Sequence, residues 1–184
     1  EPITVQQNQS NFTNSILGNA TEDINTTKNQ TFINRSNSKI NIFVGTSKNG
    51  TSFLVNNLGL MYSAMGVNTA ILDLTTNKNA YYIFTKNEEQ LRQIASNSIR
   101  ELDDGNTKGI QVNNSLTVYT SLPGEDVGQI SPDKVLQTLS NHYSLVLIDS
   151  DFNTPQEYFK YSDEIYMVQS MDILTIQPFT AFLR

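Results

Sequence analysis

Hydrophobic and polar positions divide the chain into a polar N-terminal segment and a longer region with regular apolar patterns. Of the first 39 residues, 22 are Asn, Gln, Ser or Thr, and apolar residues stand singly or in pairs. Such a segment cannot bury enough apolar surface to offset the entropy that is lost on ordering it. We therefore predict a polar linker or tail without a stable fold over residues 1–38 and a folded domain over residues 39–184.

Five short apolar runs in the second region have the composition of buried strands. They are residues 40–45, 70–74, 116–120, 145–149 and 164–169. These runs are continuous and do not alternate with polar residues, so we expect both faces of the sheet to be covered.

Segments with helical patterns separate the expected strands. Apolar residues recur at helical spacing over residues 53–66 and 81–102, capping signals open helices near residues 131 and 154, and residues 172–184 begin another helix. This alternation predicts an α/β fold with a doubly wound, mostly parallel sheet and helices on both faces. The sequence stops inside an amphipathic pattern, and we therefore expect a fold that is truncated at its C-terminus.

Composition and charge exclude several classes of protein. The chain has no Cys and one His, so a disulfide scaffold, a Cys-type zinc site, a thiol nucleophile and a multi-His metal site are excluded. The net charge of -6 gives no strong nucleic-acid signal, because phosphate neutralisation requires clustered Lys and Arg. No apolar run is long enough for a transmembrane segment.

One loop has the spacing of a phosphate-binding loop. The sequence GTSKNGTS at residues 45–52 fits the pattern G-x-x-x-x-G-K-[ST], except that Thr51 stands where the lysine is required. The two glycines allow the backbone to curl so that its amides face a phosphate at a helix N-terminus. The candidate nucleotide-binding residues are Gly45, Lys48, Asn49, Gly50, Thr51 and Ser52.

Two expected strands end in aspartate, at Asp73 and Asp149. In open α/β sheets ligands bind beyond the carboxyl ends of the strands, and an aspartate there supports Mg²⁺ in P-loop NTPases. Ser52 and Asp149 are therefore the candidate Mg²⁺ residues. The alternatives are structural: Asp73 and Asp149 can cap turns, and Thr51 and Ser52 can cap the helix.

On these motifs, residues 39–184 resemble the ParA/MinD family of deviant-loop P-loop ATPases. The family's loop pattern is K-G-G-x-G-K-[ST]-[ST], followed by one strand that ends in Asp-x-Asp and a later strand that ends in Asp. In this sequence Gly50 falls on the last glycine of the loop and Ser52 on the Mg²⁺ hydroxyl. Asp73 falls on the first Asp of Asp-x-Asp, and Asp149 matches the last Asp.

The sequence departs from the family pattern at the charged positions. Thr46 stands on the signature lysine, Thr51 on the phosphate-loop lysine and Thr75 on the second Asp of Asp-x-Asp. Each lost charge-assisted contact to a phosphate is worth about 1.5–3 kcal/mol. We therefore expect weak or no ATP hydrolysis, with Asp73 and Asp149 as relics of a catalytic site. Lys48, which falls on a glycine of the pattern, is either a replacement cation or a solvated loop lysine.

The departures are similar in kind to those of TadZ/CpaE-like members of the family, which localise pilus or secretion machinery. The resemblance implies a hydrolysis-poor scaffold that binds other proteins of a membrane-associated assembly, with ATP and Mg²⁺ as candidate ligands. It further implies a cytoplasmic location at the inner face of the membrane. The family commonly dimerises across the nucleotide through the signature lysine, and because Thr46 replaces that lysine, we expect a homodimer of this chain not to depend on nucleotide. The alternatives are an active ATPase with an atypical loop and a domain like the tyrosine autokinases of capsule export.

Overall fold

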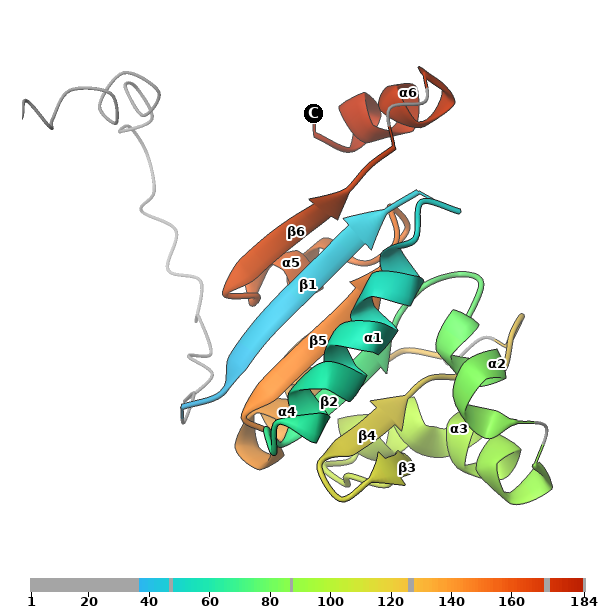
Figure 1. Ribbon diagram of the computed structural model, residues 1–184, viewed down its shortest axis with the longest axis vertical. Coiled ribbons are helices and arrows are strands. Elements are labelled where there is room, and N and C mark those ends of the chain that lie inside the picture. The colour runs from blue at the N-terminus through green and yellow to red at the C-terminus, as the bar shows by residue number, and fades with distance from the viewer. Residues whose placement is uncertain (1–36, 47, 87, 126–127, 171–172, 184) are drawn as a thin grey trace, which may run out of the picture. The chain divides into compact units, whose positions relative to one another are not determined.

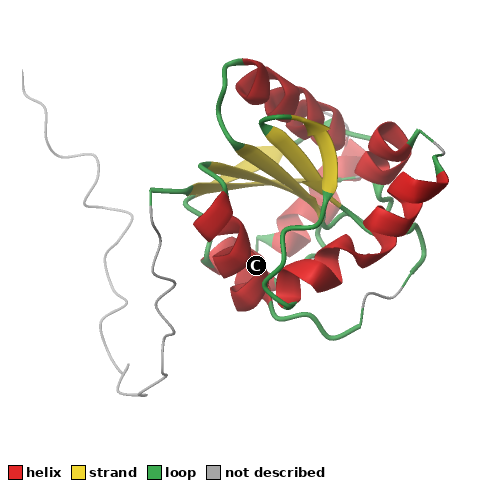
Figure 2. Cartoon of the chain, turned by 90° about the horizontal axis from the view of Figure 1, so that it is seen from below, coloured by secondary structure: helices red, strands yellow, loops and turns green. Residues whose placement is uncertain are grey.

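A computed structural model of the protein describes residues 37–46, 48–86, 88–125, 128–170 and 173–183, with the side chains of 173–175 excepted. The predicted tail over residues 1–38 therefore lies almost wholly outside the described residues. The described residues form a mostly parallel sheet with helices on both faces, which confirms the predicted fold class (Figures 1 and 2).

The sheet has six strands in the order β3-β4-β2-β5-β1-β6. Five of them are parallel, and β3 pairs with β4 in the antiparallel sense. Their bounds are β1 Lys39–Gly45, β2 Thr69–Asp73, β3 Ile110–Asn113, β4 Leu116–Tyr119, β5 Leu145–Ser150 and β6 Glu164–Val168.

Six helices connect and cover the strands. Their bounds are α1 Thr51–Ala64, α2 Asn79–Thr85, α3 Glu89–Asp103, α4 Pro132–His142, α5 Gln156–Lys160 and α6 Ile173–Phe182. Helix α1 lies against one face of the sheet, and α4 lies against the other (Figure 1). None of the helices in the described part of the chain is long and apolar enough to cross a membrane.

The core consists of two apolar clusters, one on each face of the sheet. Alternate side chains of a single strand enter different clusters: Val146 and Ile148 of β5 pack with α3, α4 and α5, whereas Leu145 and Leu147 pack with α1, α2 and α3. All six residues of β5 are buried. This two-sided burial explains why the strand sequences are continuous apolar runs.

Three elements differ from the sequence predictions. Strand β6, predicted as a buried strand, lies at the edge of the sheet and is largely exposed, with Ile165, Tyr166 and Met167 at 48%, 42% and 45% exposure. The helix predicted over residues 81–102 is two helices, because Lys86 has a left-handed backbone (φ 48°) that ends α2 before α3 begins at Glu89. Strand β3 was not predicted at all. It has four residues, of which only Ile110 is buried, so it lacks the apolar run that marks the other strands.

The parallel strands bring the predicted aspartates together. Asp73 at the end of β2 and Asp149 near the end of β5 are direct partners in the sheet register, and Phe43 of β1 pairs with Asp149 on its other side. The loop that follows β1 therefore begins beside both carboxylates. The carboxyl edge of β2, β5 and β1 is where the structure can hold a ligand.

Candidate functional site

The loop between β1 and α1 depends on its two glycines. A Cβ atom at Gly45 would lie 2.2 Å from the Oγ1 of Thr51 and 2.7 Å from the main-chain oxygen of Val168, so only glycine fits there. Gly50 has a left-handed backbone, with φ 85°, immediately before α1. The side-chain amide of Asn49 donates a hydrogen bond to Thr46 Oγ1 and closes the loop on itself. The two glycines, which were found in the sequence by their spacing, thus occupy the tight and left-handed positions that a curled phosphate-binding loop requires.

The first turn of α1 is open to a ligand. No side chain caps this helix, and no acidic residue lies in its first turn. Thr51 and Ser52 therefore do not serve as its caps, contrary to the structural alternative for these residues. Among the described residues, the buried Oγ1 of Thr51 has no hydrogen-bond partner. Uncapped N–H groups at a helix N-terminus and the partial positive charge there favour an anion.

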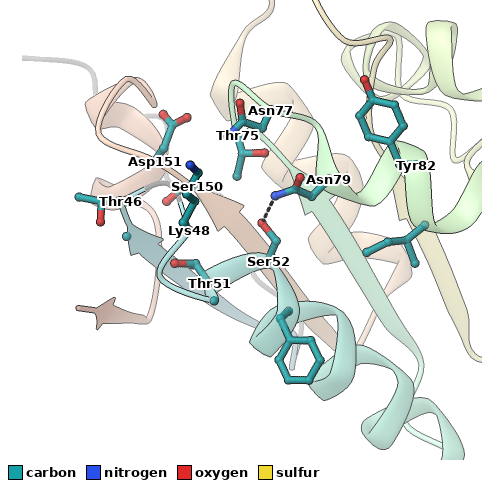
Figure 3. A pocket seen from close by; sticks show the side chains of 14 residues that line it. Thr46, Lys48, Thr51, Ser52, Thr75, Asn77, Asn79, Tyr82, Ser150 and Asp151 are labelled. Atoms are coloured by element: carbon teal, nitrogen blue, oxygen red, sulfur yellow. Dashed lines mark hydrogen bonds between the residues drawn. The ribbon is translucent and has the colours of Figure 1, made fainter. Parts of the chain in front are cut away.

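A cavity of about 440 Å³ opens beside this loop. Figure 3 shows its wall, which the loop, the start of α1, the β2–α2 segment and the end of β5 build together. Lys48 has a left-handed backbone (φ 70°), and its exposed side chain points into the cavity. The lining residues are Gly45, Thr46, Lys48, Gly50, Thr51, Ser52, Phe53, Thr75, Asn77, Asn79, Tyr82, Ile83, Ser150 and Asp151.

Asp149 is the unsatisfied carboxylate of the site. It is fully buried, and neither of its carboxylate oxygens has a hydrogen-bond partner among the described residues. Burial, helped by the charges of Asp73 and Asp151, raises the pKa of Asp149 to about 7, and the nearby Ser52 hydroxyl and the charge of Lys78 limit this rise. A buried carboxylate without donors is unusual and indicates a site that lacks one of its components.

Asp73 is fully satisfied, in contrast. Its Oδ1 accepts hydrogen bonds from the amide (3.0 Å) and the hydroxyl (2.7 Å) of Thr75, and its Oδ2 accepts from Ala80 N (3.0 Å) and Thr120 Oγ1 (3.2 Å). Burial raises the pKa of Asp73, opposed by Lys78 and by these donors. The bonds fix the β2–α2 segment, so the turn-capping alternative describes Asp73 well and does not describe Asp149.

The donor set of a magnesium site is present in part. Ser52 lies beside the cavity and accepts a hydrogen bond from Asn79 Nδ2 at 3.0 Å (Figure 3). Its oxygen keeps a second lone pair, and Asp149 has two free oxygens that water could bridge to a metal. In the described part of the chain, no group of three or more His, Asp or Glu side chains is placed to hold a metal ion directly. The residues present therefore fit Mg²⁺ only with water and a phosphate oxygen completing its shell.

Two further charged residues lie at this edge. The sequence placed Asp151 near the site only as a carboxylate without a counterpart in the family pattern, and it gave no role to Lys78. Asp151 follows β5, and its Oδ2 accepts hydrogen bonds of 2.7 Å from both the amide and the hydroxyl of Thr76. Lys78 lies at the start of α2, and its Nζ donates to the main-chain oxygen of Asp73 at 3.2 Å. In the sequence, both residues are marked only by their position shortly after a strand that ends in Asp. Their roles depend on contacts between segments that follow different strands, and the sequence does not show these contacts.

No protein-family model matches the chain, and no curated protein matches it in sequence. Solved structures do resemble it. A plasmid partition protein of Borrelia burgdorferi B31 bound to AMPPNP, an ATP analogue, aligns at 19% identity with a TM-score of 0.64, over 79% of this chain and 67% of that one. A MinC:MinD cell division complex of Aquifex aeolicus aligns at 15% identity with a TM-score of 0.57, over 77% and 60% of the two chains.

The chimerical protein CapA2B2 aligns at 18% identity with a TM-score of 0.51, over 82% of this chain and 71% of that one. At these identities the likeness concerns the fold alone. The chain therefore has a ParA/MinD-like P-loop fold.

Proposed function

We propose that the cavity binds the phosphates of a nucleotide, with ATP as the candidate, and that the protein hydrolyses it weakly or not at all. One observation carries the proposal. A glycine loop with a left-handed Gly50 leads into an uncapped helix N-terminus, beside a buried carboxylate without partners. The amides at this terminus and the Lys48 side chain would hold the phosphates.

The same proposal includes a Mg²⁺ ion bound beside the phosphates. Ser52 would contact Mg²⁺ through its hydroxyl oxygen, and Asp149 would act on it through water. Bound Mg²⁺ would neutralise phosphate charge there. The unpartnered oxygens of Asp149 support this assignment.

We expect weak hydrolysis because threonine occupies three positions at which the family pattern has a charged residue. Thr46 and Thr51 carry no charge, so they stabilise less of the negative charge that develops on the transferred phosphoryl group than lysines would. Thr75 cannot act as a general base, because a hydroxyl holds its proton far above neutral pH. Its hydroxyl moreover donates to Asp73 at 2.7 Å.

A protein that binds nucleotide without efficient turnover would act by binding other proteins and not by catalysis. We place it with the TadZ/CpaE-like scaffolds, as a localisation factor for a membrane-associated assembly such as a pilus or secretion apparatus, at the cytoplasmic face of the membrane. The similar MinD structure stands in a complex with another protein, which supports protein partners. A homodimer of this chain would be independent of nucleotide, because Thr46 cannot reach a phosphate of a second subunit.

Calorimetric titration of the full chain with ATP and Mg²⁺ tests the binding, and Gly50→Ala and Gly66→Ala form a matched pair. Both glycines have a left-handed backbone with open space around the Cα, but only Gly50 lies at the cavity. We expect Gly50→Ala to weaken binding by about tenfold or more and Gly66→Ala to leave it unchanged. Equal losses in both variants would contradict the assignment of the loop, and absence of binding to the wild type would refute the nucleotide site.

Two further measurements separate the scaffold from an active ATPase. Phosphate release should stay at the background rate, and light scattering should give the same mass with and without ATP and Mg²⁺. Turnover that disappears in Lys48→Ala would instead make the protein an ATPase in which Lys48 replaces the missing lysine.

A further inference from the structure

Helix α1 turns small or polar side chains toward the sheet and large apolar ones outward. Its buried residues are Thr51, Val55, Asn56, Gly59 and Ser63. The exposed positions recur at helical spacing and form one stripe along the helix. We call this stripe the outer face of α1; it consists of Phe53, Leu54, Asn57, Leu60, Met61, Ala64 and Met65. A helix with apolar residues on both sides is normally buried on both sides.

The close packing of α1 on the sheet explains which side chains face inward. A Cβ atom at Gly59 would lie 2.5 Å from Cδ1 of Ile71 on β2, so the helix lies near the sheet and leaves room there only for small residues. In Figure 1, α1 lies in front of the sheet, and none of the described helices or strands covers its outer face. Phe53 and Met65 are therefore 74% and 70% exposed.

The apolar surface at this face is large. Tyr82 and Ile83 of α2 are also exposed, and they line the same cavity as Phe53. With about 150–250 Å² for each fully exposed large side chain, the seven large apolar side chains here expose on the order of 700 Å². The largest apolar patch on a typical monomer covers about 300–600 Å². Each partner in a stable protein interface buries about 800 Å², so the patch is close to one side of such an interface.

The absence of charge on α1 indicates what covers its outer face. None of residues 49–72 is charged, although the chain has a net charge of -6. The one polar residue of the face, Asn57, donates its amide to the main-chain oxygen of Phe53 at 2.7 Å. A two-fold interface joins the same patch of both subunits, so a neutral apolar face is complementary to itself. A face without Lys or Arg is poorly suited to an anionic membrane surface. These features favour a second copy of the chain.

We propose that two copies of this protein associate through the outer faces of α1, packed antiparallel about a two-fold axis. The inference rests on the homodimer proposed above and names its surface. The antiparallel arrangement keeps the two positive helix N-termini apart and brings the Phe53 end of one helix to the Met65 end of the other. A thioether beside an aromatic ring is a favourable contact. The outer face contains neither Ser52 nor Asp149, so the association requires no nucleotide.

Sedimentation equilibrium of the full chain without nucleotide, over a series of concentrations, tests the proposal. We expect the wild type to reach the mass of two chains. Met61→Glu places a charge in the middle of the outer face and should weaken dimerisation by about 100-fold or more. Ile94→Glu is the matched control, because Ile94 is a similarly exposed apolar residue on α3, and its dimer should equal that of the wild type.

Two further measurements show that the loss in Met61→Glu comes from the charge and not from unfolding. A mixture of Met61→Glu and Met61→Lys should form the dimer again, because the two introduced charges are opposite. Met61 does not line the cavity, so Met61→Glu should bind ATP and Mg²⁺ as the wild type does in calorimetry. This second result keeps the test of the dimer separate from the test of the nucleotide site.

The outcomes separate the outer face from the homodimer. A dimer that persists in Met61→Glu, or that is lost equally in Ile94→Glu, would overturn the outer face as its surface. A dimer that is lost only in Met167→Glu would instead belong to the exposed edge strand β6. A wild type that stays monomeric at every concentration would refute both the homodimer and this inference. If that monomer bound phosphatidylglycerol vesicles and Met61→Glu did not, the outer face would belong to a membrane.

Discussion

Replacing Asp149 by asparagine should stabilise the protein at alkaline pH and leave its stability nearly unchanged at acidic pH. The carboxyl group is fully buried without hydrogen-bond partners among the described residues, and burial raises its pKa from 3.8 to about 7. Between about pH 4 and pH 7 the native state therefore holds more protons at this site than the unfolded state. Stability from this group falls as the pH rises through that window and stays low above it.

The magnitude follows from the same two values. The difference between 3.8 and about 7 corresponds to a cost of about 4 kcal/mol above pH 7. The asparagine amide has nearly the same shape and no charge, but it is also buried without partners, as the protonated carboxyl is at low pH. We therefore expect Asp149→Asn to be more stable than the wild type by about 2–4 kcal/mol near pH 8 and within about 1 kcal/mol of it near pH 4.5.

Urea unfolding followed by circular dichroism across this pH range measures the difference. Asp73→Asn is the control, because Asp73 accepts four hydrogen bonds and an amide cannot accept all of them. That variant should lose stability at every pH. A difference between Asp149→Asn and the wild type that stays constant from about pH 4.5 to about pH 8 would refute the reasoning.

Three further changes have defined outcomes. Gly45→Ala places a Cβ 2.2 Å from the Thr51 side-chain oxygen, so thermal unfolding should show a loss of about 1–3 kcal/mol and nucleotide binding should weaken. Tyr119→Phe removes a buried hydroxyl that lies 2.6 Å from the Tyr143 hydroxyl, and urea unfolding should show a loss of about 1–2 kcal/mol. Thr75→Asp should leave phosphate release at background, because the lysine positions of the loop stay neutral; measurable turnover would show that Thr75 alone blocks hydrolysis.

Strands β1, β2, β4 and β5 could be predicted from the sequence because they are buried on both faces, which favours apolar residues at nearly every position. Strand β6 is also an apolar run, but it lies at an edge of the sheet and its middle residues are exposed. Leu145 to Ile148 are apolar without interruption, and each is buried in the sheet. The loop could be predicted for a related reason: Gly45 and Gly50 are positions that no other residue fills without strain, and their spacing is fixed by the backbone. Strand β3 left no such pattern, because it is an edge strand with one buried residue.

A residue of the site could be predicted only where its role is visible from its own position in a loop or strand. Ser52 and Asp149 follow directly from their places after the loop and in the strand. Lys78 does not, because its side chain meets carboxylates from two strands that are separated by more than 70 residues in the sequence. Its backbone conformation, which is left-handed with φ 49°, is likewise a product of the folded β2–α2 segment, and a lysine between two asparagines is an ordinary surface sequence.

The place of β1 in the sheet has a consequence for the synthesis of the chain. Strand β1 pairs only with β5 and β6 in the described sheet, and its first partner, Leu145, comes more than 100 residues later. At roughly 5–20 residues per second, the ribosome needs on the order of 5–20 s to make that partner. During this interval Ile40 and Ile42, both fully buried in the finished fold, have no strand beside them. The nascent protein thus spends several seconds with the buried strand β1 unpaired, and we expect a chaperone to bind the chain most readily during this time.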